Sequence, residues 1–280
     1  MSDEFKLGAV VLKVADLAKM AAFYAEVIGL VKQAESEEKV LFGAKNDGDT
    51  LLVLEKLTNG VRPNMPRTGL FHTAFLVPNR AALGDMLIHL IKSKYPLSGA
   101  GDHAYSEAIY LADPEGNGIE IYRDRPFAKW RINEDGTYPA VTEEVDADAI
   151  IDAATREEFH QIHPETKIGH VHLQVSDIEA TEEFYGNILG LNIQTKIPSA
   201  RFFAEGRYHH HIGSNIWAGT NLLPRAENET GLAYFTIVTS KFKEWETRLA
   251  KAGFKMEKRH FGVQVSDPNG ILIMLQEPQI

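Results

Sequence analysis

Two stretches of the chain repeat each other, and this repeat constrains the fold more than any other feature. Residues 7–30 read LGAVVLKVADLAKMAAFYAEVIGL, and residues 168–191 read IGHVHLQVSDIEATEEFYGNILGL. Each copy begins with a short β-rich run whose residues alternate between two faces. An aspartate then stands where a helix N-cap belongs. The segment after it is long enough for one helix and ends at a glycine. The recurring residues, at a constant offset, are Val14, Asp16, Phe23, Tyr24, Gly29 and Leu30, which return as Val175, Asp177, Phe184, Tyr185, Gly190 and Leu191.

A second pair of segments resembles these two more weakly. The runs that begin at Gly69 and Gly231 each predict a strand followed by an amphipathic helix. Each leads to an Asp-Pro-x-Gly sequence, at 113–116 and 267–270, which is a turn signal between strands. The chain therefore predicts four βαβββ modules, at about 5–57, 68–123, 166–222 and 230–277.

The segment from Asp124 to Thr166 departs from the repeat. It is polar and acidic, with one short helical stretch, and we interpret it as a connector between halves. A chain of 280 residues suits two domains of ordinary size. We predict a first two-module domain at 5–123, a connector at 124–166 and a second two-module domain at 167–280.

Composition narrows the partners and the metal chemistry. The formal net charge of -10 disfavours nucleic acid and anionic membranes, since phosphate binding depends on Lys and Arg. No apolar run approaches a membrane span, and the N-terminus lacks the features of a secretory signal. We therefore expect a cytoplasmic protein whose partner is a small molecule, with a homo-oligomer left open. Cysteine is absent, so any metal must be held by His, Asp or Glu.

The repeat, the signature V-x-D-(L/I)…FY…(I/L)GL and the DP-x-G closing strand resemble the vicinal oxygen chelate family. This family includes glyoxalase I, fosfomycin- and bleomycin-resistance proteins and extradiol ring-cleaving dioxygenases. The resemblance covers nearly the whole chain outside the connector. The four-module length resembles the catechol 2,3-dioxygenase-like proteins of Gram-positive bacteria. The resemblance implies an α+β fold in which paired modules form curved, barrel-like mixed sheets that cup a divalent metal.

In this family the first and last strands of the modules supply the metal ligands. Modules two and three hold His72, Glu120 and His170 at the matching positions, whereas modules one and four hold Ala9, Tyr234 and Met274. Two imidazoles and one carboxylate form the facial triad typical of non-haem Fe(II) oxygenases. The three ligands meet only if module two pairs with module three and module one with module four. We predict this cross-pairing; sequential pairing, the alternative, would split the triad.

The resemblance also implies an acid–base histidine on a later strand of module three, where the chain reads YHHHIG. The family pattern HH-x-(L/I)-(A/G) selects His210, and strand alternation places His209 and His211 on the other face. A slip by one residue would turn these neighbours inward instead. Tyr110 matches the family's active-site tyrosine, and His103 lies near where a further histidine is expected.

Four more residues are candidates for substrate contacts. His172 shares the strand face of His170, and Trp217 lies where a glyoxalase would have its second glutamate. His209 and His211 complete the set. For all three histidines the alternative is a structural or solvated polar side chain.

The function implied by the resemblance is an extradiol dioxygenase that opens a catechol-like or hydroquinone ring with O2 to a muconic semialdehyde. Fe(II) is the favoured metal, with Mn(II) or another divalent ion left open. Two alternatives are a glyoxalase-type lyase or isomerase, which would want four ligands, and a small-molecule-binding resistance protein without a metal triad. Metal content and O2 uptake would separate the three.

Overall fold

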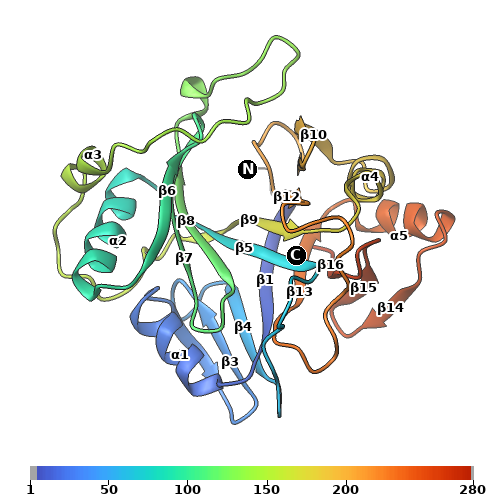
Figure 1. Cartoon of the computed structure of the whole chain (residues 1–280), viewed down its shortest axis with the longest axis horizontal. Coiled ribbons are helices and arrows are strands. Elements are labelled where there is room, and N and C mark those ends of the chain that lie inside the picture. The colour runs from blue at the N-terminus through green and yellow to red at the C-terminus, as the bar shows by residue number, and fades with distance from the viewer. Residues whose placement is uncertain (1–4, 279–280) are drawn as a thin grey trace.

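Four βαβββ modules build two eight-stranded mixed sheets in the computed structural model, which describes residues 5–278 (Figure 1). The first four residues and the end of the predicted second domain, 279–280, lie outside this range. Module one comprises β1 (Phe5–Val14), α1 (Leu17–Glu26), β2 (Val31–Glu35), β3 (Lys39–Gly43) and β4 (Thr50–Lys56). Module two comprises β5 (Gly69–Leu76), α2 (Arg80–Ser93), β6 (Leu97–Asp102), β7 (Ser106–Ala112) and β8 (Gly118–Asp124).

The second half repeats this order after a connector. The connector contains a 3-10 helix η1 (Phe127–Lys129) and α3 (Ala147–Asp152). Module three comprises β9 (Lys167–Gln174), α4 (Ile178–Glu182), the π-helical stretch η2 (Glu183–Ile188), β10 (Asn192–Ile197), β11 (Ala200–Ala204) and β12 (Ile212–Asn215). Module four comprises β13 (Gly231–Thr239), α5 (Phe242–Lys251), β14 (Met256–Arg259), β15 (Gly262–Ser266) and β16 (Leu272–Gln276). The predicted α+β fold is therefore confirmed.

The recurring aspartates cap the first helix of each half. The Asp16 side chain accepts the Lys19 N–H at 3.0 Å, and the Asp177 side chain accepts the Ala180 N–H at 2.8 Å. This bond satisfies one of the backbone donors that a helix N-terminus leaves unpaired. Both helical segments are followed by a glycine with a left-handed φ, at Gly29 and its counterpart in the second half. The sequence repeat therefore marks where each helix begins and ends.

The modules cross-pair, as the triad argument predicts. One sheet has the order β14-β15-β16-β13-β1-β4-β3-β2 and unites modules four and one. The other has the order β10-β11-β12-β9-β5-β8-β7-β6 and unites modules three and two. In this second sheet β5 and β9 run antiparallel, with Ala74 opposite His170 and His72 opposite His172 (Figure 1). Sequential pairing is wrong for this chain.

Two buried Tyr–Asp pairs join one sheet to the other. The Tyr24 hydroxyl on α1 donates to Asp113 at 2.9 Å, in the turn between β7 and β8. The Tyr185 hydroxyl on η2 donates to Asp267 at 3.2 Å, in the turn before β16. Each pair links a helix of one sheet's module with the closing turn of the other sheet. The recurring tyrosine and the Asp-Pro turn of the sequence thus meet in space.

The connector covers one end of the second sheet. Helix α3 packs against α2. Tyr138, which precedes α3 in the connector, both donates a hydrogen bond to β10 and accepts one from it. The Tyr138 N–H donates to the Gln194 carbonyl at 2.8 Å, and the Thr195 hydroxyl donates to the Tyr138 carbonyl at 2.8 Å. Asp102 and Glu143 exchange two backbone hydrogen bonds. The segment around 138–143 is therefore pinned to both β6 and β10.

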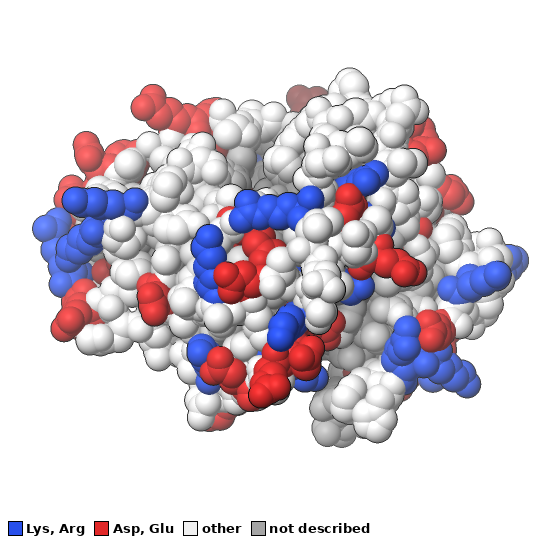
Figure 2. All heavy atoms as spheres, turned by 60° about the horizontal axis from the view of Figure 1, so that its bottom comes forward, with Lys and Arg blue, Asp and Glu red and all other residues white. Residues whose placement is uncertain are grey.

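Acidic and basic side chains are interspersed over the face shown in Figure 2. Among residues 5–278, no helix has the length and apolar character that a membrane span requires.

Each sheet takes one module from each half, so we expect neither half to fold alone. Residues 1–125 and 160–280, expressed separately, should give no cooperative thermal transition in near-UV circular dichroism, because β1 and β5 of the first half are then separated from their partners β13 and β9 in the second. Mixing the two should restore the transition. A cooperative transition from either half by itself would contradict this expectation. The division of the chain into two sequence domains stays a prediction until this is measured.

A pH dependence follows from Asp267. Burial raises the pKa of this carboxyl to about 6, against backbone donors from Asn269 and Ile271 that lower it. The unfolded pKa is about 3.9, so the folded state binds the proton more tightly. This contribution to the free energy of unfolding is full below pH 4 and falls by up to roughly 3 kcal/mol as the pH rises through 6.

Asp267→Asn cannot ionise. Its stability relative to wild type, from urea unfolding, should therefore improve between pH 4 and pH 7. An exposed Asp49→Asn is the control, and a pH-independent difference for Asp267→Asn would contradict the assignment.

Candidate metal centre

Three ligand atoms converge on the inner face of the module two–three sheet. The Nε2 atoms of His72 on β5 and His170 on β9 lie 3.3 Å apart. The Glu120 Oε2 atom on β8 lies 3.0 Å from His72 Nε2 and 3.2 Å from His170 Nε2. All three side chains are buried, and they are the one group of this kind among the described residues. The predicted triad is therefore brought together by the fold.

This triangle has the dimensions of a metal site. Two atoms about 2.1 Å from an ion lie ~3.0 Å apart at a right angle and ~3.4 Å apart at the tetrahedral angle. The observed separations fall between these values. Within residues 5–278 no Lys or Arg bonds the Glu120 carboxylate, and a buried carboxylate without a cation costs several kcal/mol. His170 Nδ1 is buried without a hydrogen-bond partner in the described part of the chain. The donor set fits a divalent ion.

Burial and mutual contact set the protonation of the triad. Burial by itself would raise the pKa of Glu120, but the charges and hydrogen bonds of His170 and His72 outweigh it and hold that pKa well below its usual range. Burial also lowers the pKa of His170 to about 4, against the opposing effect of Glu120. The imidazole of His170 is therefore neutral near pH 7, with a lone pair available for a metal.

The strand register shows where a fourth ligand would stand. On β8, Glu120 lies two residues beyond the partner of His72, which is Gly118. Beside β9, Ile212 pairs with Val171, so the residue next to His170 is His211. The residue two positions further on, which corresponds to Glu120, is Gly213. The prediction that Trp217 stands in that place is corrected: Gly213 does. A Cβ at Gly213 would meet the His172 ring at 3.0 Å, so that ring fills the space of a fourth ligand.

A cavity of about 280 Å³ opens on the triad. Eight of the ten predicted site residues line it, and the two that do not are His209 and His211. Its volume is just below the ~300–1,000 Å³ of cavities for drug-sized ligands, so it suits a small ligand. The aromatic walls include Phe71, Phe202 and Trp217. The predicted residues that line it are His72, His103, Tyr110, Glu120, His170, His172, His210 and Trp217.

Tyr110 and His103 form a hydrogen-bonded pair on this cavity. Tyr110 lies directly opposite Glu120 in the β7–β8 ladder. His103 Nδ1 lies 2.9 Å from the Val141 carbonyl, which can only accept, so this nitrogen carries the proton. With its single ring proton on Nδ1, His103 accepts a hydrogen bond at Nε2 from the Tyr110 hydroxyl, over 2.6 Å. Burial raises the pKa of Tyr110 far above its usual value, which keeps the phenol protonated.

His172 presents an unpaired nitrogen. Its ring centroid lies 4.9 Å from that of His72 and 5.4 Å from that of Trp217. Burial lowers the pKa of His172 well below its usual range, so the ring is neutral. Its Nε2 is buried without a hydrogen-bond partner among the described residues. A substrate atom could supply that partner.

The triple histidine lies in the loop between β11 and β12, which corrects the prediction that it belongs to a strand. Strand β12 begins only at Ile212, and Gly206, with φ +67°, turns the chain before the histidines. Strand alternation therefore does not decide their directions. His210 nevertheless faces the cavity, with its ring centroid 4.2 Å from that of His170. Burial lowers the pKa of His210 well below its usual range, helped by the neighbouring histidines.

The other two histidines of the run do not reach the cavity. His209 Nε2 lies 2.9 Å from Asp124 Oδ1, behind His210. His211 packs against Phe5, with ring centroids 4.6 Å apart, and burial lowers its pKa to about 3. Neither His209 nor His211 lines the metal cavity, so their role in substrate binding stays a prediction.

Several residues of the site escaped the sequence reasoning. Connector residues 140–142 form part of the cavity wall, as do Tyr105 and residues 195 and 197 of β10. Asp124 falls at the predicted start of the connector, yet it closes β8. One signal could have found it: Glu120, Tyr122 and Asp124 are spaced two residues apart, so they lie on the same face of the strand.

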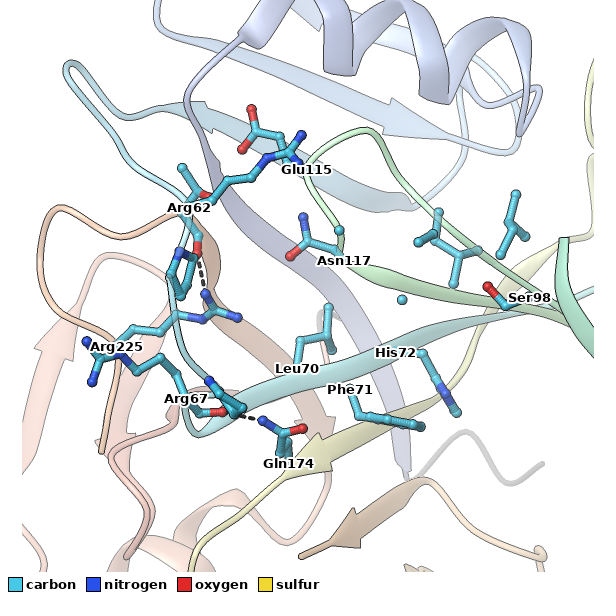
Figure 3. A pocket seen from close by; sticks show the side chains of 18 of the residues that line it. Arg62, Arg67, Leu70, Phe71, His72, Ser98, Glu115, Asn117, Gln174 and Arg225 are labelled. Carbon is cyan, nitrogen blue, oxygen red and sulfur yellow. Dashed lines mark hydrogen bonds between the residues drawn. The ribbon is translucent and has the colours of Figure 1, made fainter. Parts of the chain in front are cut away.

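A larger cavity of about 640 Å³ adjoins the metal cavity (Figure 3). The two share Phe71, His72 and Tyr110 in their linings. In Figure 3, Arg62, Arg67 and Arg225 lie on the side away from His72. Arg67 is paired with Glu229 at 2.9 Å.

Comparisons with known proteins agree with this architecture. The sequence model described as the Glyoxalase/Bleomycin resistance protein/Dioxygenase superfamily matches residues 6–121 and 167–275. A Bacillus subtilis (strain 168) protein named catechol-2,3-dioxygenase is 38% identical over 274 residues, which cover 95% of each chain.

Solved structures share the fold at low sequence identity. A Bacillus subtilis strain 168 protein named as a candidate dioxygenase has a TM-score of 0.66 at 14% identity, covering 100% of this chain and 87% of its own. Glyoxalase I from Zea mays has a TM-score of 0.58 at 14% identity, covering 98% and 92%. At such identities the likeness concerns the fold alone.

We expect one divalent ion to bind per chain. In calorimetric titration of chelator-treated protein with Mn(II), His72→Ala should bind at least about 100-fold more weakly than wild type, because one of three donors is lost. His172→Gln is the matched control, since His172 lines the same cavity outside the triad. Equal losses in both variants, or none in His72→Ala, would contradict the site.

Proposed function

Because the chain belongs to the Glyoxalase/Bleomycin resistance protein/Dioxygenase superfamily, we propose that it is an extradiol dioxygenase that cleaves a catechol-like or hydroquinone ring with O2. The observation that carries the proposal is the buried triangle of His72, His170 and Glu120 beside neutral acid–base groups in a small aromatic cavity. The relative named catechol-2,3-dioxygenase supports the same reaction class.

We propose that His72, His170 and Glu120 hold Fe(II), with Mn(II) as the alternative. When bound, the ion would bring the vicinal oxygens of the substrate and O2 together and ease loss of a hydroxyl proton. The protein contributes three donors from three adjacent strands, which leaves the cavity side of the ion open. The burial of all three excludes bulk water from the centre.

The aromatic walls would orient the substrate ring. Phe71 and Trp217 pack edge to face, with ring centroids 5.2 Å apart, and Phe202 lies edge-on to both His172 and His210. A flat ring placed among them gains apolar contact, and its polar edge can then face the triad. Trp217 is 53% exposed, so it lies at the mouth of the cavity.

His210 is our candidate acid–base residue. It is neutral because burial lowers its pKa, and its ring packs against that of His170. A neutral imidazole in this position can take a proton from a substrate hydroxyl and later return it. Tyr110 and His103 face the same space as hydrogen-bonding groups, and the unpaired Nε2 of His172 can bind a substrate oxygen.

One observation weighs against the glyoxalase-type alternative. Such an enzyme would want a fourth ligand, and the strand register puts Gly213 in that place, covered by the His172 ring. The three-donor site thus favours the dioxygenase over the lyase or isomerase. A resistance protein that binds its ligand without a metal would have no use for the buried triangle.

The test is oxygen consumption with catechol after anaerobic loading with Fe(II), together with the visible absorbance of a ring-fission product. Wild type should consume O2, and His210→Gln should retain metal but lose about 10²–10⁴-fold in kcat, the usual range for acid–base catalysis. The exposed His260→Gln is the control. Bound metal with no O2 uptake over a panel of catechols and hydroquinones would instead support the lyase or isomerase.

A further inference from the structure

Hydrogen bonds link Asp124, His209 and His210 in a series that ends at the metal cavity. Asp124 Oδ1 lies 2.9 Å from His209 Nε2, and His209 Nδ1 lies 2.8 Å from His210 Nδ1. His209 and His210 are 1% and 5% exposed. We infer that Asp124 and His209 are positioning residues: they hold His210 in one tautomer, with the proton on Nδ1 and the lone pair of Nε2 facing the cavity.

The donors and acceptors in this hydrogen-bonded series determine the tautomer of His210. A carboxylate oxygen only accepts, so His209 must donate its Nε2–H to Asp124. With that single ring proton on Nε2, His209 has a bare Nδ1, which accepts. His210 must therefore donate from Nδ1, which leaves its Nε2 unprotonated. That atom makes no hydrogen bond to any residue in 5–278, and the ring lines the cavity.

Packing leaves His209 little freedom to turn away from this arrangement. Its ring stacks on Tyr105, with centroids 4.4 Å apart and planes 16° apart. Tyr208 lies on it with centroids 4.1 Å apart, and Trp130 lies 5.3 Å away. A 180° rotation of the ring would exchange each nitrogen with a carbon and so put a carbon against both Asp124 and His210. Hydrogen bonds and aromatic contacts therefore together fix the orientation of the His209 ring.

Asp124 is placed by the strand that also carries a metal ligand. Glu120 and Asp124 lie four residues apart on β8, so both point to the same face. Tyr122 between them packs on His170, with ring centroids 4.8 Å apart. Strand β8 therefore sets the distance between the triad and Asp124, which accepts the hydrogen bond of His209. A change in the tilt of β8 would move both together.

The arrangement matters for the proposed reaction, on which this part of the inference rests. A bare Nε2 can take a proton from a substrate hydroxyl, whereas the other tautomer would offer a donor there. The proton would move from oxygen to Nε2 with no other bond changed. The Asp124 carboxylate, one ring further away, would then stabilise the positive charge on the histidine pair, as a carboxylate does behind a catalytic histidine.

The first test is independent of catalysis. Two-bond 1H–15N correlations of the full-length 15N-labelled protein, loaded with Zn(II), distinguish the two tautomers, and the His210 signals are those lost in His210→Gln. The inference expects a protonated Nδ1 and a bare Nε2 on His210. His209→Phe keeps the stacking but removes the acceptor, so this pattern should be lost. A proton on Nε2 in wild type, or an unchanged pattern in His209→Phe, would overturn the inference.

The second test separates positioning from general packing. Asp124→Asn should lower kcat for catechol at least about 10-fold while KM and bound iron stay within about 2-fold. Tyr208→Phe is the matched control, because it removes a hydrogen bond of 2.9 Å to the other oxygen of the same carboxylate. Equal effects of both variants, or none from Asp124→Asn, would overturn the positioning role. If wild type shows no O2 uptake, the proposed function fails, and the tautomer measurement still decides this inference.

Discussion

The antiparallel pairing of β5 with β9 is the contact on which the rest of the site depends. It joins the first strands of modules two and three and puts His72 and His170, which are 98 residues apart, within 3.3 Å of each other. Glu120 then arrives on the strand next to β5. In a sequential pairing the two histidines would lie on different sheets. Long-range strand pairing of this kind, rather than any local motif, builds the metal centre.

The same architecture is used twice, but only one copy carries a candidate site. Pairing of β1 with β13 gives the module one–four sheet the same topology, with Ala9, Tyr234 and Met274 at the ligand positions. That sheet is held to the first by the Tyr24–Asp113 and Tyr185–Asp267 pairs. In a fold duplicated in this way, one sheet can hold a binding site while the other contributes only to packing. The two roles need different side chains, so each sheet can carry its own set.

The polar interior of the site runs against the rule that buried groups are apolar. Six of the eleven histidines are buried, and all six belong to module two or three: His72, His170, His172, His209, His210 and His211. Burial lowers the pKa of four of them, so they are neutral and can be hydrogen-bonded or bind metal without the cost of a buried charge. Such a concentration of polar groups is expected where function overrides stability.

The sequence by itself determined the modules, the helix starts at Asp16 and Asp177, the candidate triad that the fold brings together and, through the need to unite it, the pairing of the modules. These rest on repeats and on local hydrogen-bonding preferences, which adjacent residues carry. Only the tertiary structure decided that the triple histidine lies in a loop before β12, that Gly213 stands at the fourth ligand position, that connector residues 140–142 wall the cavity, and that Asp124 contacts His209. These features depend on strand register and on contacts between segments far apart in the chain, which no local pattern encodes.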